Sequence, residues 1–475
     1  MQTHFLARET GDLSPDSYSR EATSYLLRSF AAAPHHRFDG QVGFDDQSRP
    51  RDIRAHGAGV STIAVERFDG RVLLSGGSEG ALKLWDLEES GNPHDAHVYR
   101  PVATVARIPA GEKGRGHSHG ITHVAFYPFD PDAFLSSSYD KSLKLWSTET
   151  VQLSAHFDLN ATVYSHSTSP IADHLLVACA TQHSSVRLVD LKSGAAVHAL
   201  VAHGGPVLAT AWSPRHEHVL VSGHADGKVR VWDVRRSGGV LALLDQEDSM
   251  GMVQRLKESK AAGERGRLPR YNDNAQAHDE AVNGVAWTDD GRYIISSGLD
   301  RKIRVWDAAT GANTLASYGA VVQNQQAKTA TIVTSPTVLS LNRQIMFWPN
   351  EQEILMLDLH EGHLLGRLRS PGATNPLGHK QGLTGRNRIT GIAWRSAGGG
   401  GRQIGPVMGG ANSIGALYSA HMDGSIRAWM PQLPGVEDFA EEDEDIGEDA
   451  EARKRKRKAV DDAYKSLMGK KVTFT

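Results

Sequence analysis

Short runs of alternating apolar and polar residues recur along most of the chain, separated by turns rich in glycine and aspartate. In the runs 82–86, 229–233 and 303–307, leucine, valine or isoleucine alternates with lysine or arginine before a tryptophan. Such alternation over a few residues predicts β-strands. Helical spacing is largely confined to the first 34 residues. We therefore expect an all-β protein with a helical N-terminus.

The strand pattern belongs to an internal repeat. Five segments align, and in each a serine precedes an acid by four residues and the acid precedes a tryptophan by six. The serines are Ser75, Ser136, Ser222, Ser296 and Ser419; the acids are Glu79, Asp140, Asp226, Asp300 and Asp423; the tryptophans are Trp85, Trp146, Trp232, Trp306 and Trp429. Two weaker copies, 180–194 and 350–362, have Val189 and Leu357 in the tryptophan position. The repeat thus predicts seven similar units.

This pattern resembles the WD40 repeat, and seven copies imply a seven-bladed β-propeller. The resemblance also implies that an aspartate, a histidine, a serine and the tryptophan of one blade form a buried hydrogen-bond network. A histidine lies 21 to 23 residues before four of the acids, which assigns His56, His119, His203 and His278 to these networks. Glu79 departs from the usual aspartate, so the network of the first blade stays open.

We expect three parts along the chain: a helical segment 1–34, a propeller 50–434 and a disordered tail 435–475. The last repeat is followed by Pro431 and Pro434, which leaves no room for a fourth strand. Residues 50–56 are predicted to supply that strand and to close the ring. Long spacings between repeats indicate insertions at 92–116, 245–276 and 396–415.

The N-terminal segment has the pattern of an amphipathic helix over 14–34, capped by Ser14 and ended by Pro34. Its apolar face comprises Tyr18, Ala22, Tyr25, Leu26, Phe30 and Ala33. Two interpretations remain open. The helix packs on its own propeller, or it docks into a groove of a partner.

Composition narrows the chemistry. The net charge is −3, and one cysteine, Cys179, excludes a disulfide framework and a cysteine-rich zinc module. No run of 18 apolar residues indicates a membrane span, and the first residues lack the apolar core of a signal peptide. The G-x-S-x-G match at 76–80 recurs as a repeat turn rather than a nucleophile elbow. We therefore expect no enzyme, metal or cofactor.

The C-terminal tail separates its charges. Residues 436–451 carry ten acids and no base. A basic run follows, consisting of Arg453, Lys454, Arg455, Lys456, Arg457 and Lys458. Such a run indicates a nuclear localisation signal or a nucleic-acid patch. We expect a nuclear protein.

The Trp232–Arg235 stretch reads W-D-V-R. A lone arginine here is most simply a solvated loop residue. However, W-D-x-R resembles the motif of propellers that serve as substrate receptors of cullin-4-type ubiquitin ligases. Several segments, taken in their order along the chain, are together similar to the Cockayne syndrome group A family. They are FLARETG, SSSYDKSLKLW, TVYSHSTSP, AWSPRHEHVL and VWDVRRSGG.

That resemblance implies a substrate receptor of a cullin-RING ligase in transcription-coupled DNA repair. Its implied partners are an adaptor of the damaged-DNA-binding protein 1 type, an ATPase of the Cockayne syndrome group B type and stalled RNA polymerase II, with no sequence-specific nucleic-acid binding and no membrane. The residues expected to bind the adaptor are Phe5, Leu6, Tyr25, Leu26, Phe30, Trp232, Asp233 and Arg235. The alternative is a WD40 scaffold of a nuclear chromatin or histone-binding complex without a ligase link.

Overall fold

The structure is a computed structural model. It describes residues 8–12, 14, 17, 24–40, 53–89, 96–109, 114–236, 239–250, 275–336, 344–369, 387–395 and 415–431. Phe5, Leu6, the charged tail with Arg453–Lys458, and most of the insertions 245–276 and 396–415 lie outside these ranges. The described strands form seven blade sheets and one small two-stranded sheet.

Each blade is a meander of antiparallel strands, numbered here in chain order around the ring. Blade 1 contains β3 (Val60–Val65), β4 (Val72–Gly77), β5 (Leu82–Asp86) and β7 (Pro101–Val105). Blade 2 contains β8 (Ile121–Phe126), β9 (Ala133–Ser138), β10 (Ser142–Ser147) and β11 (Leu153–Asp158). Blade 3 contains β12 (Val163–Thr168), β13 (Leu176–Thr181), β14 (Val186–Asp190) and β15 (Ala195–Leu200). Blade 4 contains β16 (Val207–Trp212), β17 (Val219–His224), β18 (Val229–Asp233) and β19 (Val240–Leu243).

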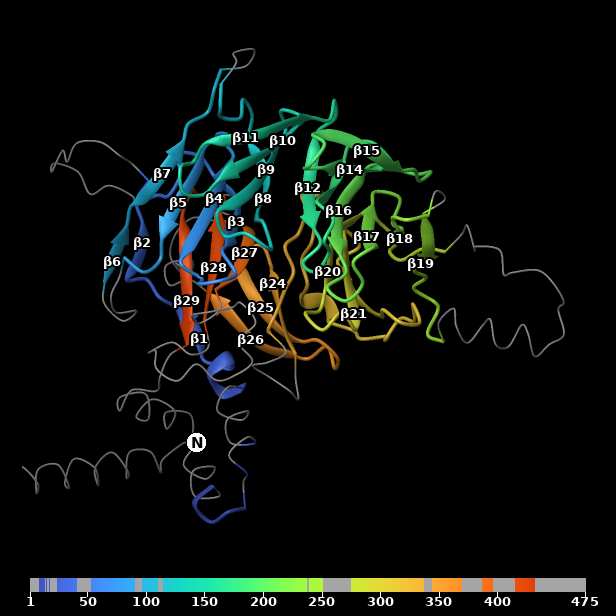
Figure 1. Cartoon of the computed structure of the whole chain (residues 1–475). Coiled ribbons are helices and arrows are strands. Elements are labelled where there is room, and N and C mark those ends of the chain that lie inside the picture. Colours follow the sequence, from blue (N-terminus) through green and yellow to red (C-terminus); the bar gives the residue numbers. More distant parts are fainter. Residues whose placement is uncertain are drawn as a thin grey trace, which may run out of the picture. The chain divides into compact units, whose positions relative to one another are not determined.

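The remaining blades complete the ring. Blade 5 contains β20 (Val282–Trp287), β21 (Tyr293–Gly298) and β22 (Ile303–Asp307). Blade 6 contains β23 (Val333–Thr334), β24 (Ile345–Pro349), β25 (Glu353–Asp358) and β26 (Leu364–Arg369). Blade 7 contains β27 (Ile389–Arg395), β28 (Ala416–His421), β29 (Ile426–Pro431) and β1 (Phe30–Ala32). The prediction of a seven-bladed all-β propeller is confirmed, and the two weak copies form blades 3 and 6 (Figure 1).

The innermost strands of six blades share one irregularity. In each, one residue near the start of the strand is skipped in the pairing with the second strand, which is a β-bulge. The bulge residues are Ser61, Thr122, Tyr164, Leu208, Asn283 and Thr390. A bulge residue is unpaired in its ladder, so its carbonyl group needs another partner.

The ring is closed by β1, which corrects the prediction that residues 50–56 close it. Phe30 pairs with Pro431 and Ala32 with Trp429 in an antiparallel register, and β1 lies beside β29 in Figure 1. The described residues 53–56 instead form the loop that carries His56 to blade 1. β1 takes the closing position because it buries Phe30, which is 4% exposed, against Phe347 and Trp394.

The predicted helix is therefore shorter at its C-terminal end. Residues 24–28 are helical, the chain turns at Ser29, and β1 begins at Phe30 rather than after Pro34. The Ser29 N–H contacts the carbonyl groups of Tyr25 and Leu26, and its hydroxyl group donates to Leu26. Beyond β1, β2 (His36–Phe38) pairs in parallel with β6 (His97–Tyr99), which lies in the predicted insertion 92–116.

Candidate functional site

In three blades, a histidine from the loop before the inner strand joins the serine, the tryptophan and the acid of the repeat. In blade 2, His117 Nδ1 lies 2.8 Å from Asp140 Oδ2 and His117 Nε2 lies 2.7 Å from Ser136 Oγ. Trp146 Nε1 donates to the same hydroxyl group at 2.8 Å. The sequence assigned His119 to this network, and that assignment is wrong. His119 is exposed and contacts Ser118 Oγ.

Blade 1 has the same geometry despite its glutamate. His56 Nδ1 lies 2.9 Å from Glu79 Oε1, and His56 Nε2 lies 2.8 Å from Ser75 Oγ. Trp85 Nε1 donates to Ser75 Oγ at 2.9 Å, and the Glu79 carboxylate accepts the Ala58 N–H. The longer side chain thus fills the aspartate position, because it still reaches both the histidine and the loop backbone.

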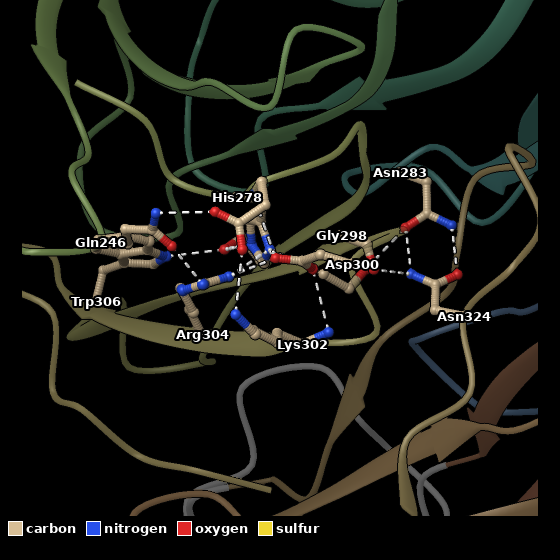
Figure 2. A network of polar contacts seen from close by, with 12 residues as sticks. Gln246, His278, Asn283, Gly298, Asp300, Lys302, Arg304, Trp306 and Asn324 are labelled. Atoms are coloured by element: carbon tan, nitrogen blue, oxygen red, sulfur yellow. Dashed lines mark hydrogen bonds and ion pairs between the residues drawn. The ribbon is translucent and has the colours of Figure 1, made fainter. Parts of the chain in front are cut away.

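Blade 5 holds the most extended network (Figure 2). His278 Nε2 lies 2.8 Å from Ser296 Oγ, which accepts Trp306 Nε1 at 2.9 Å, and His278 Nδ1 lies 3.0 Å from Asp300 Oδ1. Arg304 adds a bond to the Asp300 carboxylate at 3.0 Å. The network therefore satisfies buried polar groups from the loop and from two strands.

Blades 4 and 7 use a different histidine, which comes from the second strand itself. His224 Nε2 lies 2.7 Å from Ser222 Oγ, and Trp232 Nε1 donates to that hydroxyl group. His203, assigned from the sequence, is exposed and offers its carbonyl oxygen to Arg230. Arg230 Nη2 also lies 2.8 Å from Asp226 Oδ2, so the acid pairs with an arginine.

Blade 7 repeats this arrangement. His421 Nε2 lies 2.8 Å from Ser419 Oγ, and Trp429 Nε1 donates to the same atom. Arg427 Nη2 lies 3.0 Å from Asp423 Oδ2. No histidine had been assigned to this blade from the sequence, although His421 occupies the same place in the repeat as His224.

The residue two positions after the serine is small in the three blades that take a histidine from the loop: Gly77, Ser138 and Gly298. A Cβ atom on Gly298 would lie 2.4 Å from His278 Nδ1, and one on Gly77 would lie 2.5 Å from His56 Nδ1. A large side chain there excludes a histidine from the loop. In blades 4 and 7 the position is itself histidine. The spacing S-x-H-x-D is the sequence signal that would have identified these two networks.

Burial sets the charge states of the networks. Burial lowers the pKa of His56, His117 and His278, and the neighbouring carboxylates offset this only in part. Burial alone would raise the pKa of Asp300, but hydrogen bonds from His278 and Arg304 hold it well below its ordinary value. The networks therefore contain neutral histidines beside ionised acids. Their polar groups already bond one another, so the networks serve a structural role.

The described residues among those expected to bind an adaptor do not form one exposed surface. Phe30 is buried in the cluster between blades 6 and 7, together with Leu27, and Leu26 is partly buried there. Trp232 is 1% exposed and committed to Ser222 in blade 4. Neither aromatic side chain can serve as a free anchor, because each already fills the propeller core.

Tyr25 and Arg235 do remain accessible. Tyr25 is 44% exposed. The Arg235 side chain is 64% exposed and forms two bonds to the Asp233 carboxylate, at 3.0 and 2.9 Å. Arg236 Nε lies 3.6 Å from the same carboxylate. Asp233 thus holds both arginines at the corner after β18.

Within the described ranges, no group of three or more histidine, cysteine, aspartate or glutamate side chains is arranged to hold a metal ion. In the part of the chain that the structure describes, no helix is long and apolar enough to cross a membrane.

Comparison with known proteins agrees with this architecture. Four segments match the family "WD domain, G-beta repeat", at residues 48–86, 112–147, 194–233 and 273–307. Together with the seven-bladed ring, these matches define the chain as a WD40-repeat β-propeller.

Among its relatives, the chain is 29% identical to the "WD repeat-containing protein ATCSA-1" of Arabidopsis thaliana, over 66% of this chain and 76% of that protein. It is 28% identical to the "Ribosome biogenesis protein YTM1" of Phaeosphaeria nodorum, over 54% and 55%. It is 31% identical to the "Ribosome biogenesis protein WDR12 homolog" of Chlamydomonas reinhardtii, over 38% and 43%. The chain thus spans about half or less of the ribosome biogenesis relatives that it matches.

These relatives correct the expected function and partners. Several of these relatives, from fungi, flies and an alga, are named as ribosome biogenesis proteins. The interpretation as a cullin-4 ligase receptor with a damaged-DNA-binding adaptor, a repair ATPase and RNA polymerase is therefore wrong. Arg235, the residue that suggested an adaptor contact, is instead held by Asp233 within the same corner.

Proposed function

We propose that the chain is a non-catalytic WD40 scaffold of a nuclear assembly, and that this assembly acts in ribosome biogenesis. The observation that carries the proposal is the seven-bladed ring, whose polar clusters are committed to holding the blades together. Its outer surfaces are then available for protein contacts. The relatives named for ribosome biogenesis supply the process. The motifs that occur in the same order along the chain also support a common ancestry with Cockayne syndrome group A proteins. The ligase role is not part of this proposal.

Sedimentation tests this function. The full chain, tagged at its own locus, is followed through a sucrose gradient of nuclear extract. We expect it to travel with particles that contain precursor ribosomal RNA, and we expect its depletion to make that RNA accumulate. Sedimentation with histones, or as a free protein, with unchanged precursor RNA would contradict the ribosomal assignment.

The tail carries the nuclear part of the proposal. Replacing the six residues Arg453–Lys458 with alanine is expected to move the full chain to the cytoplasm. The matched control replaces five of the acids of 436–451 with asparagine or glutamine and keeps the basic run. Fluorescence microscopy checks both variants. Nuclear accumulation without the basic run would mean that another segment directs import.

A further inference from the structure

Three consecutive residues before β23 lie on the axis of the ring. Lys328 Nζ donates to the carbonyl group of Ser61 in blade 1. Thr329 Oγ1 donates to Leu208 in blade 4 at 2.9 Å, and the Ala330 N–H donates to Asn283 in blade 5 at 2.9 Å. Neighbouring residues can reach blades 1, 4 and 5 at once only if they lie in the central channel. We call residues 324–330 the channel segment.

The channel segment is anchored by the bulges of the inner strands. Ser61, Leu208 and Asn283 are all bulge residues, so they are skipped in the pairing of their own blades and their carbonyl groups can accept bonds from the channel segment. The Asn283 amide group also donates to Asn324 Oδ1 at 2.8 Å, as Figure 2 shows, and Asn324 returns a bond at the same distance. Lys328 is therefore held in place from several blades.

The titratable groups that act on Lys328 and on its neighbours are all basic among the described residues. Burial and, to a smaller extent, the charge of Arg388, beside β27, together lower the pKa of Lys328 to about 7. Burial and, to a smaller extent, Lys328 together lower the pKa of His123 on β8 to about 4. His166 on β12 faces His123, with 3.4 Å between the Nδ1 atoms, and its buried Nε2 atom has no partner among the described residues. Among the described residues, no carboxylate acts on Lys328, His123 or His166.

Two exposed side chains near the basic set offer apolar surface. Tyr139, in the turn after β9, is 49% exposed and lies near Tyr164, whose carbonyl group accepts a hydrogen bond from Thr329 Oγ1 at 3.5 Å. Met422, in the turn after β28, is 44% exposed, and its N–H donates to the Arg388 carbonyl group at 2.8 Å. The mouth of the channel thus combines basic side chains, without a carboxylate partner among the described residues, with exposed apolar surface.

We propose that this mouth, formed by Lys328, Arg388, Tyr139 and Met422, binds an acidic segment of a protein partner that carries a bulky apolar residue beside its carboxylate. The carboxylate supplies the missing counter-charge, and the apolar residue covers the exposed apolar surface. A slender peptide suits a channel mouth that the channel segment already narrows. The site would be one contact of the proposed scaffold, so it rests on that proposed function.

Fluorescence anisotropy with the purified full chain tests the site. The probe is a labelled six-residue peptide of alternating glutamate and leucine, with a lysine–leucine peptide and a ten-nucleotide oligouridylate as comparisons. We expect Lys328→Met and Arg388→Gln each to weaken binding of the acidic peptide at least about fivefold. Lys302→Met is the control. Lys302 follows β21 in blade 5, as Tyr139 follows β9 and Met422 follows β28, but it pairs with Asp279 at 3.1 Å. We expect it to change the affinity less than about twofold.

Three results would overturn the proposal: equal affinity in all variants, equal binding of the basic peptide, or Lys328-dependent binding of oligouridylate without binding of the acidic peptide. If Lys328→Met fails to fold, Arg388→Gln decides alone, since it leaves the anchors of the channel segment in place. Failure of peptide binding would leave the sedimentation result untouched. The two proposals can therefore fail separately.

Discussion

Single side chains decide how each blade is held together. One hydroxyl group receives a tryptophan N–H and contacts a histidine, and the histidine comes from a loop or from the strand. A buried group that loses its partner costs about 1–3 kcal/mol, so each network can be tested by deleting one member.

Blade 2 offers a matched pair of histidines. We expect His117→Ala to lower the free energy of unfolding by about 1–3 kcal/mol, because Ser136 and Asp140 lose a buried partner. His119→Ala is expected to change it by less than about 0.5 kcal/mol, because His119 is exposed. Urea unfolding measures both. If His119→Ala lowered the free energy of unfolding more than His117→Ala does, His119 would be the histidine of the blade 2 network.

The glycine beside the loop histidine is a second test at this scale. Gly298→Ala would place a methyl group 2.4 Å from His278 Nδ1 and 2.5 Å from Asp300 Oδ1, so we expect a cost of about 1–3 kcal/mol. Gly366→Ala is the control, because the nearest atom, Met356 Sδ, is 3.5 Å away. Equal melting temperatures would show that the packing at Gly298 is loose.

Among the elements, strands were predictable and the closing strand was not. Alternation and the tryptophan repeat identify β5, β18 and β22, because apolar residues alternate with lysine or arginine before the tryptophan, although nearly every residue of these strands is buried. β1 has only three residues and continues the apolar spacing of the helix before it. Its conformation is set by pairing with β29, a partner at the other end of the propeller, and local spacing carries no record of that contact.

The same limit applies to the site. The serine, acid and tryptophan of each network stand at fixed spacings and could be assigned from the sequence. His117 and His119 could not be separated by spacing alone, because both lie in one short loop. Lys328 carries no motif, since its position on the ring axis depends on bulges in three other blades.

Closure by β1 makes a strong prediction about the N-terminal segment. Phe30→Ala is expected to cost about 3–5 kcal/mol, because the ring packs against Trp394 at 5.6 Å and Phe347 at 6.2 Å between centroids. Tyr25→Ala is the control, with an exposed ring and an expected cost below about 0.5 kcal/mol. Thermal unfolding distinguishes the two variants.

Deleting residues 1–34 extends that test. It removes β1, so the N–H and carbonyl groups of β29 become an open edge that favours association between chains. Closure by residues 50–56, as expected from the sequence, would instead have left the truncated propeller intact. Light scattering should detect aggregates. A monomer with the melting temperature of the full chain would show that another segment replaces β1.

Across the whole molecule, the neutral histidines make stability depend on pH. The folded pKa of His56, His117, His278 and His421 is lowered by burial, so below about pH 6.5 the unfolded chain takes up protons that the folded chain refuses. Lys328, with a pKa of about 7, acts in the same direction at higher pH. Stability must therefore fall on acidification.

One pKa unit corresponds to roughly 1.4 kcal/mol, so we expect the free energy of unfolding to fall by at least about 3 kcal/mol between about pH 8 and about pH 5. Urea unfolding across this range measures the loss. His421→Asn should flatten the dependence, because one of the titrating groups is removed. A stability that rises on acidification would mean that these histidines are charged in the fold.

The pairing of β1 with β29 also has a consequence in time. Roughly 400 residues separate the two strands, and at about 5–20 residues per second a ribosome needs on the order of 20–80 s to make them. During that interval Phe30 has no cavity to fill, and an incomplete arc of blades presents unmated edges. We expect a chaperone to hold the nascent chain until Trp429 emerges, because only then can the first-made strand complete the last-made blade.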